Sequence, residues 1–127
     1  MEKILVVEDN DDSRRMLVRL LGADGYEVAE ADDGITAWEM LQQEHIPLVI
    51  TDWLMGQMAG IELVEHIRAS EFSNSTYVIM VTAQADSVDT TLGYHAGVDA
   101  YMAKPLDLEE LPVKLEDALR SLNNLAG

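Results

Sequence analysis

Residues 4–12 read ILVVEDNDD, and this stretch decides the fold. Its first four residues are apolar and mostly β-branched, which predicts a buried strand because the run is too short for a helix. Apolar residues then recur at helical spacing at positions 16, 17, 20 and 21, with Arg14, Arg15 and Arg19 on the opposite face. A buried strand followed by an amphipathic helix is the first half of a β–α–β unit.

The same alternation of strand and helix continues along the chain. Further strands are predicted at residues 26–30, 48–51, 77–81 and 99–102. Apolar stripes predict the other helices, at positions 35, 38 and 41, at 61, 64 and 67, at 88, 92 and 96, and at 111, 115, 118, 119 and 122. Gly22 and Gly25 should end the first helix, and Asp107 should cap the last, with Pro112 delaying or kinking its start. Five strands alternating with five helices indicate an α/β fold whose parallel sheet is covered on both faces.

Composition and charge narrow the class of protein. The chain has 127 residues, of which 48% are hydrophobic, and this suits a single domain over residues 1–127 with a packed core. Its 24 acidic and 8 basic side chains give a formal net charge of −16, which argues against direct binding to nucleic acid or to an anionic membrane. The chain has no cysteine, no apolar run near the roughly 20 residues of a membrane span, and no signal-peptide pattern. We therefore expect a soluble, cytoplasmic domain.

Side chains that can carry chemistry follow four of the predicted strands. In chain order they are Glu8 and Asp9, Asp52, Thr82 and Ala83, and Lys104 and Pro105. In an open parallel sheet, ligands bind at the carboxyl ends of the strands. Lys104 is also the only lysine or arginine between Arg68 and Lys114, in a strongly acidic part of the chain. We expect these side chains to meet at one edge of the sheet.

Three carboxylates and a lysine at one edge predict a site for a metal ion and a phosphate. Glu8, Asp9 and Asp52 would repel one another without a cation, and their oxygens suit Mg²⁺ or Mn²⁺. Lys104 offers a charge to a bound anion, and Thr82 offers a hydroxyl donor. Taken alone, each residue has an ordinary explanation as a turn former, helix cap, strand residue or surface charge. Together they favour phosphoryl transfer onto a carboxylate.

Four motifs resemble the receiver domain of two-component response regulators. They are VVEDN at residues 6–10, DWLM at 52–55 with Gly60, VTA at 81–83 and YMAKP at 101–105, in the family's order over essentially the whole chain. The resemblance implies a flavodoxin-like doubly wound (βα)5 sandwich of three layers, with strand order 2-1-3-4-5. It also implies a phosphorylation-activated switch that catalyses only its own phosphorylation and dephosphorylation.

The resemblance implies a role for each residue at the acidic edge. Asp52 would be the phosphoacceptor, taking a phosphoryl group from a histidine of a sensor kinase or phosphotransfer protein. Asp9, Asp52 and the backbone carbonyl of Leu54 would bind Mg²⁺ directly, and Glu8 would act through a water molecule. Glu8 departs from the commoner aspartate of the family, which lengthens its reach.

The resemblance also implies a phosphate site and a switch. Lys104, Thr82 and Ala83 would bind the phosphoryl group, and Thr82 and Tyr101 would move together on phosphorylation. Tyr101 also has a simpler interpretation, as a buried aromatic residue of an edge strand. The peptide bond before Pro105 would be cis. A downstream protein would bind the face made by the fourth helix (around residues 88–96), the fifth strand (99–102) and the last helix (from residue 107).

Two departures and several alternatives remain. Gly56 stands where the family usually has proline, and Ala59 where an acid often precedes Gly60, so the lifetime of the phosphoryl group is in question. A phosphorylation-independent interaction module, or the N-terminal receiver of a larger regulator or hybrid kinase, would share the same motifs. A dehalogenase-type phosphohydrolase would need an acid where Leu54 stands. A flavin carrier would need its phosphate in the loop after the first strand, which is acidic and lacks a glycine nest.

Overall fold

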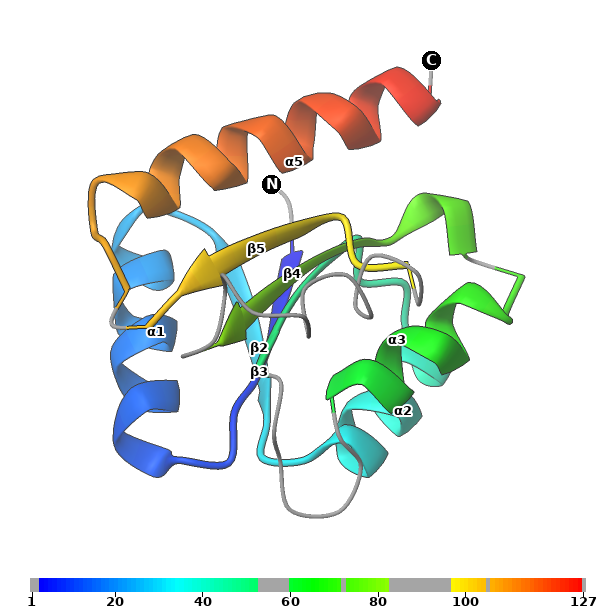
Figure 1. Ribbon diagram of the computed structural model, residues 1–127, viewed down its shortest axis with the longest axis horizontal. Helices are drawn as coiled ribbons and strands as arrows, with labels where there is room; N and C mark the ends of the chain where they lie inside the picture. The colour runs from blue at the N-terminus through cyan, green and yellow to red at the C-terminus, as the bar shows by residue number, and fades with distance from the viewer. Residues whose placement is uncertain (1–2, 53–59, 72, 83–96, 105, 127) are drawn as a thin grey trace.

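Five strands form one parallel sheet in the order β2-β1-β3-β4-β5 (Figure 1). The computed structural model describes residues 3–52, 60–71, 73–82, 97–104 and 106–126. The strands are β1 (Lys3–Val7), β2 (Glu27–Ala31), β3 (Leu48–Asp52), β4 (Tyr77–Thr82) and β5 (Ala100–Ala103). β2 and β5 begin one residue later than predicted. The predicted class, a flavodoxin-like doubly wound sandwich with strand order 2-1-3-4-5, is confirmed.

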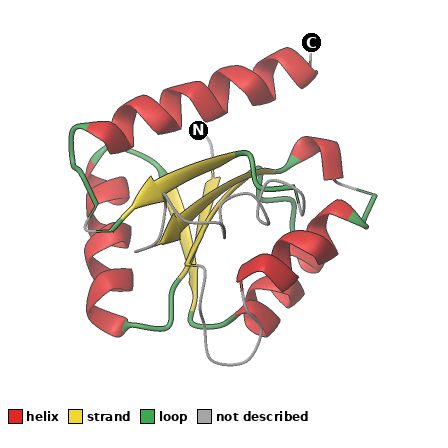
Figure 2. Ribbon diagram, viewed as in Figure 1, coloured by secondary structure: helices red, strands yellow, loops and turns green. Residues whose placement is uncertain are grey.

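Helices cover both faces of the sheet and complete three layers (Figure 2). The described helices are α1 (Asp11–Ala23), α2 (Gly34–Gln43), α3 (Gly60–Arg68) and α5 (Glu110–Ala126), with a short 3-10 helix, η1 (Ser73–Ser75). In Figure 1, α1 and α5 lie on one side of the sheet and α2 and α3 on the other. The helix predicted around residues 88–96 lies outside the described residues. Among those that are described, no helix is both long enough and apolar enough to cross a membrane.

The core has two halves because neighbouring residues of a strand point to opposite faces of the sheet. Ile4 and Val6 pack in the half formed with α1 and α5. Leu5 and Val7 pack in the half formed with α2 and α3. All four side chains are at most 1% exposed, which explains why the first strand is apolar without a break.

The end of α1 differs from its prediction. The helix runs through Gly22 to Ala23, because the Asp24 amide donates to the carbonyl of Leu20 and keeps the helical bonding pattern. Gly22 therefore does not end the helix. Gly25, with φ of 95°, follows the helix end in the left-handed region that glycine adopts easily.

The last helix begins late, as Pro112 predicted. An oxygen of the Asp107 side chain accepts a hydrogen bond from the Glu109 amide at 2.8 Å, and the Asp107 carbonyl accepts from the amides of Glu110 and Leu111. The helix proper starts at Glu110, so Pro112 is its third residue. In the first turn the missing N–H of proline costs no helical hydrogen bond.

Gly60 allows α3 to start directly against the end of β3. A Cβ atom at this position would overlap the carbonyl oxygen of Asp52 and would lie 3.2 Å from the sulfur of Met80. Only glycine fits this approach without movement of the backbone. The contact fixes α3 against the strand end that carries Asp52.

We predict that Gly60→Ala lowers the free energy of unfolding by about 1–3 kcal/mol, because the added methyl group forces the backbone apart. Gly22→Ala is the matched control, since a Cβ there meets nothing within 4 Å. In the helix it should raise stability by up to about 1 kcal/mol. Urea unfolding followed by circular dichroism measures both changes. Equal stability of Gly60→Ala and the natural sequence would contradict the close approach.

Candidate functional site

The parallel register brings the predicted site residues to one edge of the sheet. β1, β3, β4 and β5 end at nearly the same level. In strand order the edge carries Glu8 and Asp9 after β1, Asp52 at the end of β3, Thr82 at the end of β4 and Lys104 after β5. Parallel pairing of the strands therefore brings together side chains that are up to 96 residues apart in the chain.

Glu8, Asp9 and Asp52 form a cluster of carboxylates. One oxygen from each lies within 4.8 Å of the oxygens of the other two. The Glu8 and Asp52 side chains are only 8% and 14% exposed, whereas Asp9 is exposed. The proximity of the three carboxylates and their all-oxygen chemistry suit a hard divalent cation.

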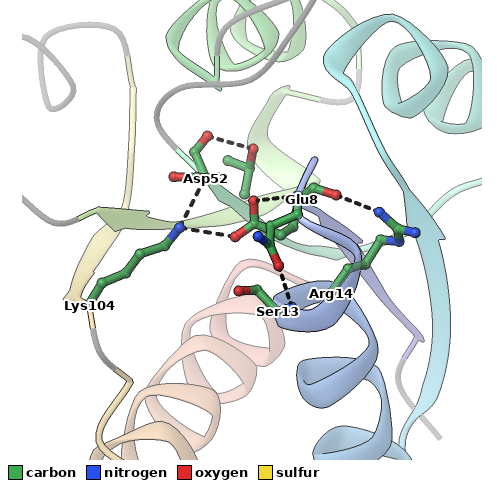
Figure 3. Close-up of polar contacts among 7 residues, drawn as sticks. Glu8, Ser13, Arg14, Asp52 and Lys104 are labelled. Carbon is green, nitrogen blue, oxygen red and sulfur yellow. Dashed lines mark hydrogen bonds and ion pairs between the residues drawn. The ribbon is translucent and has the colours of Figure 1, made fainter.

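Lys104 reaches two of the three carboxylates (Figure 3). Its Nζ donates to Oε1 of Glu8 and to Oδ2 of Asp52, both at 3.0 Å. Partial burial lowers the pKa of Lys104, but the hydrogen bonds to Asp52 and Glu8 outweigh this and raise the pKa above its usual value. The side chain is 34% exposed, so its charge remains accessible to an anion in solvent.

Asp9 is held in its protonated form more readily than a free aspartate, because its pKa is raised. Although the residue is exposed overall, its pKa is raised, first by partial desolvation of the carboxyl group and then by its hydrogen bond to Glu8 and repulsion from that carboxylate. Lys104 opposes the shift without cancelling it. A divalent cation would reverse this penalty, because it favours the ionised form of every ligand.

The turn that carries Glu8 and Asp9 is tied to its surroundings. The Glu8 amide donates to the carbonyl of Ala31 at 3.1 Å and extends the pairing of β1 with β2. The Asn10 amide donates to Oε2 of Glu8 at 3.3 Å. The side-chain oxygen of Asn10 caps α1 by accepting from the Ser13 amide at 2.9 Å. These contacts hold the carboxylates in place before any ligand binds.

Thr82 and Lys104 are placed by backbone pairing between the last two strands. The Lys104 amide donates to the carbonyl of Thr82 at 3.0 Å, just beyond the pair formed by Thr82 and Ala103. Thr82 is 6% exposed at the end of β4. The lysine and the hydroxyl therefore follow adjacent strand ends, on the same edge as Asp52.

An apolar cavity of about 410 Å³ adjoins the cluster on the α1 side of the sheet. Its walls include Met16 and Leu17 of α1 and Leu106, and the Asp52 and Lys104 side chains line it too. Apolar walls strengthen electrostatic interactions among neighbouring charges. The cavity thus strengthens the electrostatic interactions at the acidic edge.

The remaining predicted residues lie elsewhere or outside the described part of the chain. Tyr101 in β5 is 9% exposed and packs in the core half formed with α2 and α3, as its simpler interpretation expected. The predicted roles that fall outside the described residues are those of Leu54, Ala83 and Pro105, together with the departures at Gly56 and Ala59.

The arrangement can bind a divalent cation and a phosphate, and it can offer a carboxylate as nucleophile. Asp52 is held by Lys104 and lies beside two carboxylates that could share a cation with it. Thr51 supports the same strand end, since its hydroxyl donates to the Asp52 carbonyl at 3.1 Å. These are the components that phosphoryl transfer to a carboxylate needs.

Known proteins with similar sequences and structures carry the same architecture. Residues 4–116 match the family model of the response regulator receiver domain. The chain is 38% identical over 119 residues to the chemotaxis protein CheY homolog of Campylobacter jejuni, covering 92% of each chain. It is 38% identical over 122 residues to chemotaxis protein CheY of Pseudomonas aeruginosa, covering 95% of this chain and 98% of that one. The structure of Vibrio cholerae chemotaxis protein CheY4 has a TM-score of 0.88 at 30% identity, covering 93% of this chain and 98% of that one. The chain belongs to the response regulator receiver domain family.

Proposed function

We propose that this receiver domain is a phosphorylation-activated signalling switch in which Asp52 accepts a phosphoryl group. The donor would be a phosphohistidine of a sensor kinase or phosphotransfer protein. The observation that carries the proposal is the pairing of Lys104 with Asp52 and Glu8 beside the exposed carboxylate of Asp9. That cluster combines a nucleophile, a cation site and an anion partner.

The transfer follows from the position of Asp52. One carboxylate oxygen forms a bond to phosphorus while the bond from phosphorus to the histidine nitrogen breaks, and that electron pair stays with the imidazole. Mg²⁺ held by Glu8, Asp9 and Asp52, or Mn²⁺ in its place, would neutralise the charge that gathers there. Lys104 already lies 3.0 Å from the acceptor carboxylate, so it can hold an oxygen of the phosphoryl group on Asp52.

The signal would leave the domain through its last strand and helix. Phosphorylation adds charge beside Thr82, and the Thr82 hydroxyl can bond a phosphoryl oxygen. Tyr101 is the second residue of β5, two positions before Ala103, which pairs with Thr82, so a shift of β4 reaches it through β5. We propose that a downstream protein binds a face containing β5, α5 and the helix predicted around residues 88–96. The domain would act in the cytoplasm and catalyse only its own phosphorylation and dephosphorylation.

Incubation with acetyl phosphate and Mg²⁺, followed by intact mass, tests the acceptor. The natural sequence should gain one phosphoryl group, and Asp52→Asn should gain none. Asp32→Asn, at an exposed carboxylate outside the cluster, is the control and should be labelled normally. An unlabelled natural protein would favour a phosphorylation-independent interaction module, and equal labelling of Asp52→Asn would remove Asp52 as acceptor.

The raised pKa of Asp9 predicts a dependence of stability on pH. Without metal, the folded state holds this proton more tightly than the unfolded chain, so the contribution of Asp9 is greatest below the usual aspartate range. That contribution is lost as pH rises through the raised pKa. In chelator at neutral pH, Asp9→Asn should therefore be more stable than the natural sequence, and the difference should vanish in acid. Mg²⁺ should stabilise the natural sequence more than the variant.

Thermal unfolding across a pH series, with chelator or with Mg²⁺, measures these effects. Asp12→Asn serves as the control, because Asp12 is exposed and outside the cluster. If Asp9→Asn and Asp12→Asn change the stability equally at neutral pH, the Asp9 carboxylate does not destabilise the folded state as predicted.

Removal of the Lys104 charge should separate metal binding from phosphate binding. Lys104→Met takes away a positive charge 3.0 Å from two carboxylates, so Mg²⁺ should bind several-fold more tightly. The same variant should be impaired in labelling by acetyl phosphate, in binding to a downstream partner, or in both. Calorimetric Mg²⁺ titration and intact mass measure these effects, with Lys114→Met in α5 as the control. Unchanged Mg²⁺ affinity would contradict the pairing.

A further inference from the structure

Arg14 of α1 reaches back to the turn that carries Glu8 and Asp9 (Figure 3). Its Nη1 donates to the main-chain carbonyl of Glu8 at 2.9 Å. Its Nε donates to Oε1 of Glu30 at 3.0 Å, and its Nη2 to Oδ1 of Asp11 at 2.6 Å. The Arg14 side chain is only 12% exposed, although these two carboxylates are 49% and 65% exposed. A single guanidinium thus joins the end of β1 to β2 and to the first turn of α1.

The contact with Glu8 fixes the main chain immediately before Asp9. The Glu8 amide is held by the carbonyl of Ala31, and the Glu8 carbonyl by Arg14. On the other side of Asp9, the Asn10 amide is held by the Glu8 side chain. Asp9 therefore projects from a peptide segment that is fixed at both ends, and its direction toward Asp52 depends on those contacts.

The charge of Arg14 and its geometry have opposite consequences for a metal ion. A positive charge near the cluster would weaken cation binding by repulsion. A guanidinium that holds the Glu8–Asp9 segment would strengthen cation binding, because ligands held in place need not be ordered when the ion arrives. The two effects therefore predict changes of opposite sign when the arginine is removed.

We propose that Arg14 is a positioning residue for the Mg²⁺ site. By holding the Glu8 carbonyl, Arg14 keeps the Asp9 carboxylate beside Asp52. The inference rests on the proposed function, because it takes the carboxylate cluster to be the Mg²⁺ site. Arg14 contacts no ligand itself, and it acts through the backbone of the turn.

Calorimetric Mg²⁺ titration of Arg14→Lys and Arg14→Gln tests the proposal. Arg14→Lys keeps the charge but cannot make three directed contacts, so it should bind Mg²⁺ about tenfold more weakly. Arg14→Gln should also bind more weakly, although loss of its charge alone would strengthen binding. Arg15→Gln is the control, because this exposed neighbour makes none of the three contacts and loses the same charge. It should bind Mg²⁺ as tightly as the natural sequence, or more tightly.

A second measurement separates positioning from a loss of fold. Circular dichroism in chelator should give Arg14→Lys a folded spectrum, and raising the Mg²⁺ concentration should restore its labelling rate with acetyl phosphate to that of the natural sequence. Natural-like Mg²⁺ affinity in Arg14→Lys, or tighter binding by Arg14→Gln, would overturn the role of Arg14 and leave the proposed function intact. A natural protein that binds no Mg²⁺ would overturn the metal site itself, and this inference with it.

Discussion

The ion pairs that Lys104 makes with Glu8 and Asp52 are the interaction on which the edge of the sheet depends. Three carboxylates with oxygens within 4.8 Å of one another repel each other unless positive charge lies among them. Lys104 supplies one such charge and ties the ends of β1, β3 and β5 together. One lysine leaves the three carboxylates short of neutrality, so a divalent cation fits, and the pKa of Asp9 is raised by desolvation and by its neighbour Glu8. The site of this receiver domain thus has more negative charge than its lysine can neutralise.

The parallel sheet is what brings these negative charges together. All five strands run the same way, so every strand ends at one edge and the acids that follow them are forced together. The two halves of the core, with α1 and α5 on one face and α2 and α3 on the other, pack against the strands that end at this edge. Most of the net charge of −16 belongs to other residues of the surface. Only the few carboxylates at the strand ends belong to the candidate site.

Sequence patterns predicted the strands, the strand ends and the grouping of Asp52 with Glu8, Asp9 and Lys104, because burial and strand direction leave a periodic trace in the chain. They assigned Arg14 only to the polar face of a helix, since its partner Glu30 is 16 residues away and the Glu8 contact is to the main chain. The sequence also placed the end of α1 too early, at Gly22. Helical hydrogen bonding continues past this residue despite the tendency of glycine to end helices. Gly60 was recognised as part of a motif, but its contact with the Asp52 carbonyl depends on how α3 packs against β3.

The position of the phosphoryl group is the central claim, and chemical trapping measures it most directly. Borohydride reduces an acyl phosphate to an alcohol, so a phosphorylated aspartate becomes homoserine, whereas an aspartate carboxylate does not react. After treatment with acetyl phosphate and Mg²⁺, borohydride reduction and peptide mapping by tandem mass spectrometry should find homoserine at position 52 and at no other aspartate. Homoserine at position 9, or none anywhere in the chain, would contradict the account.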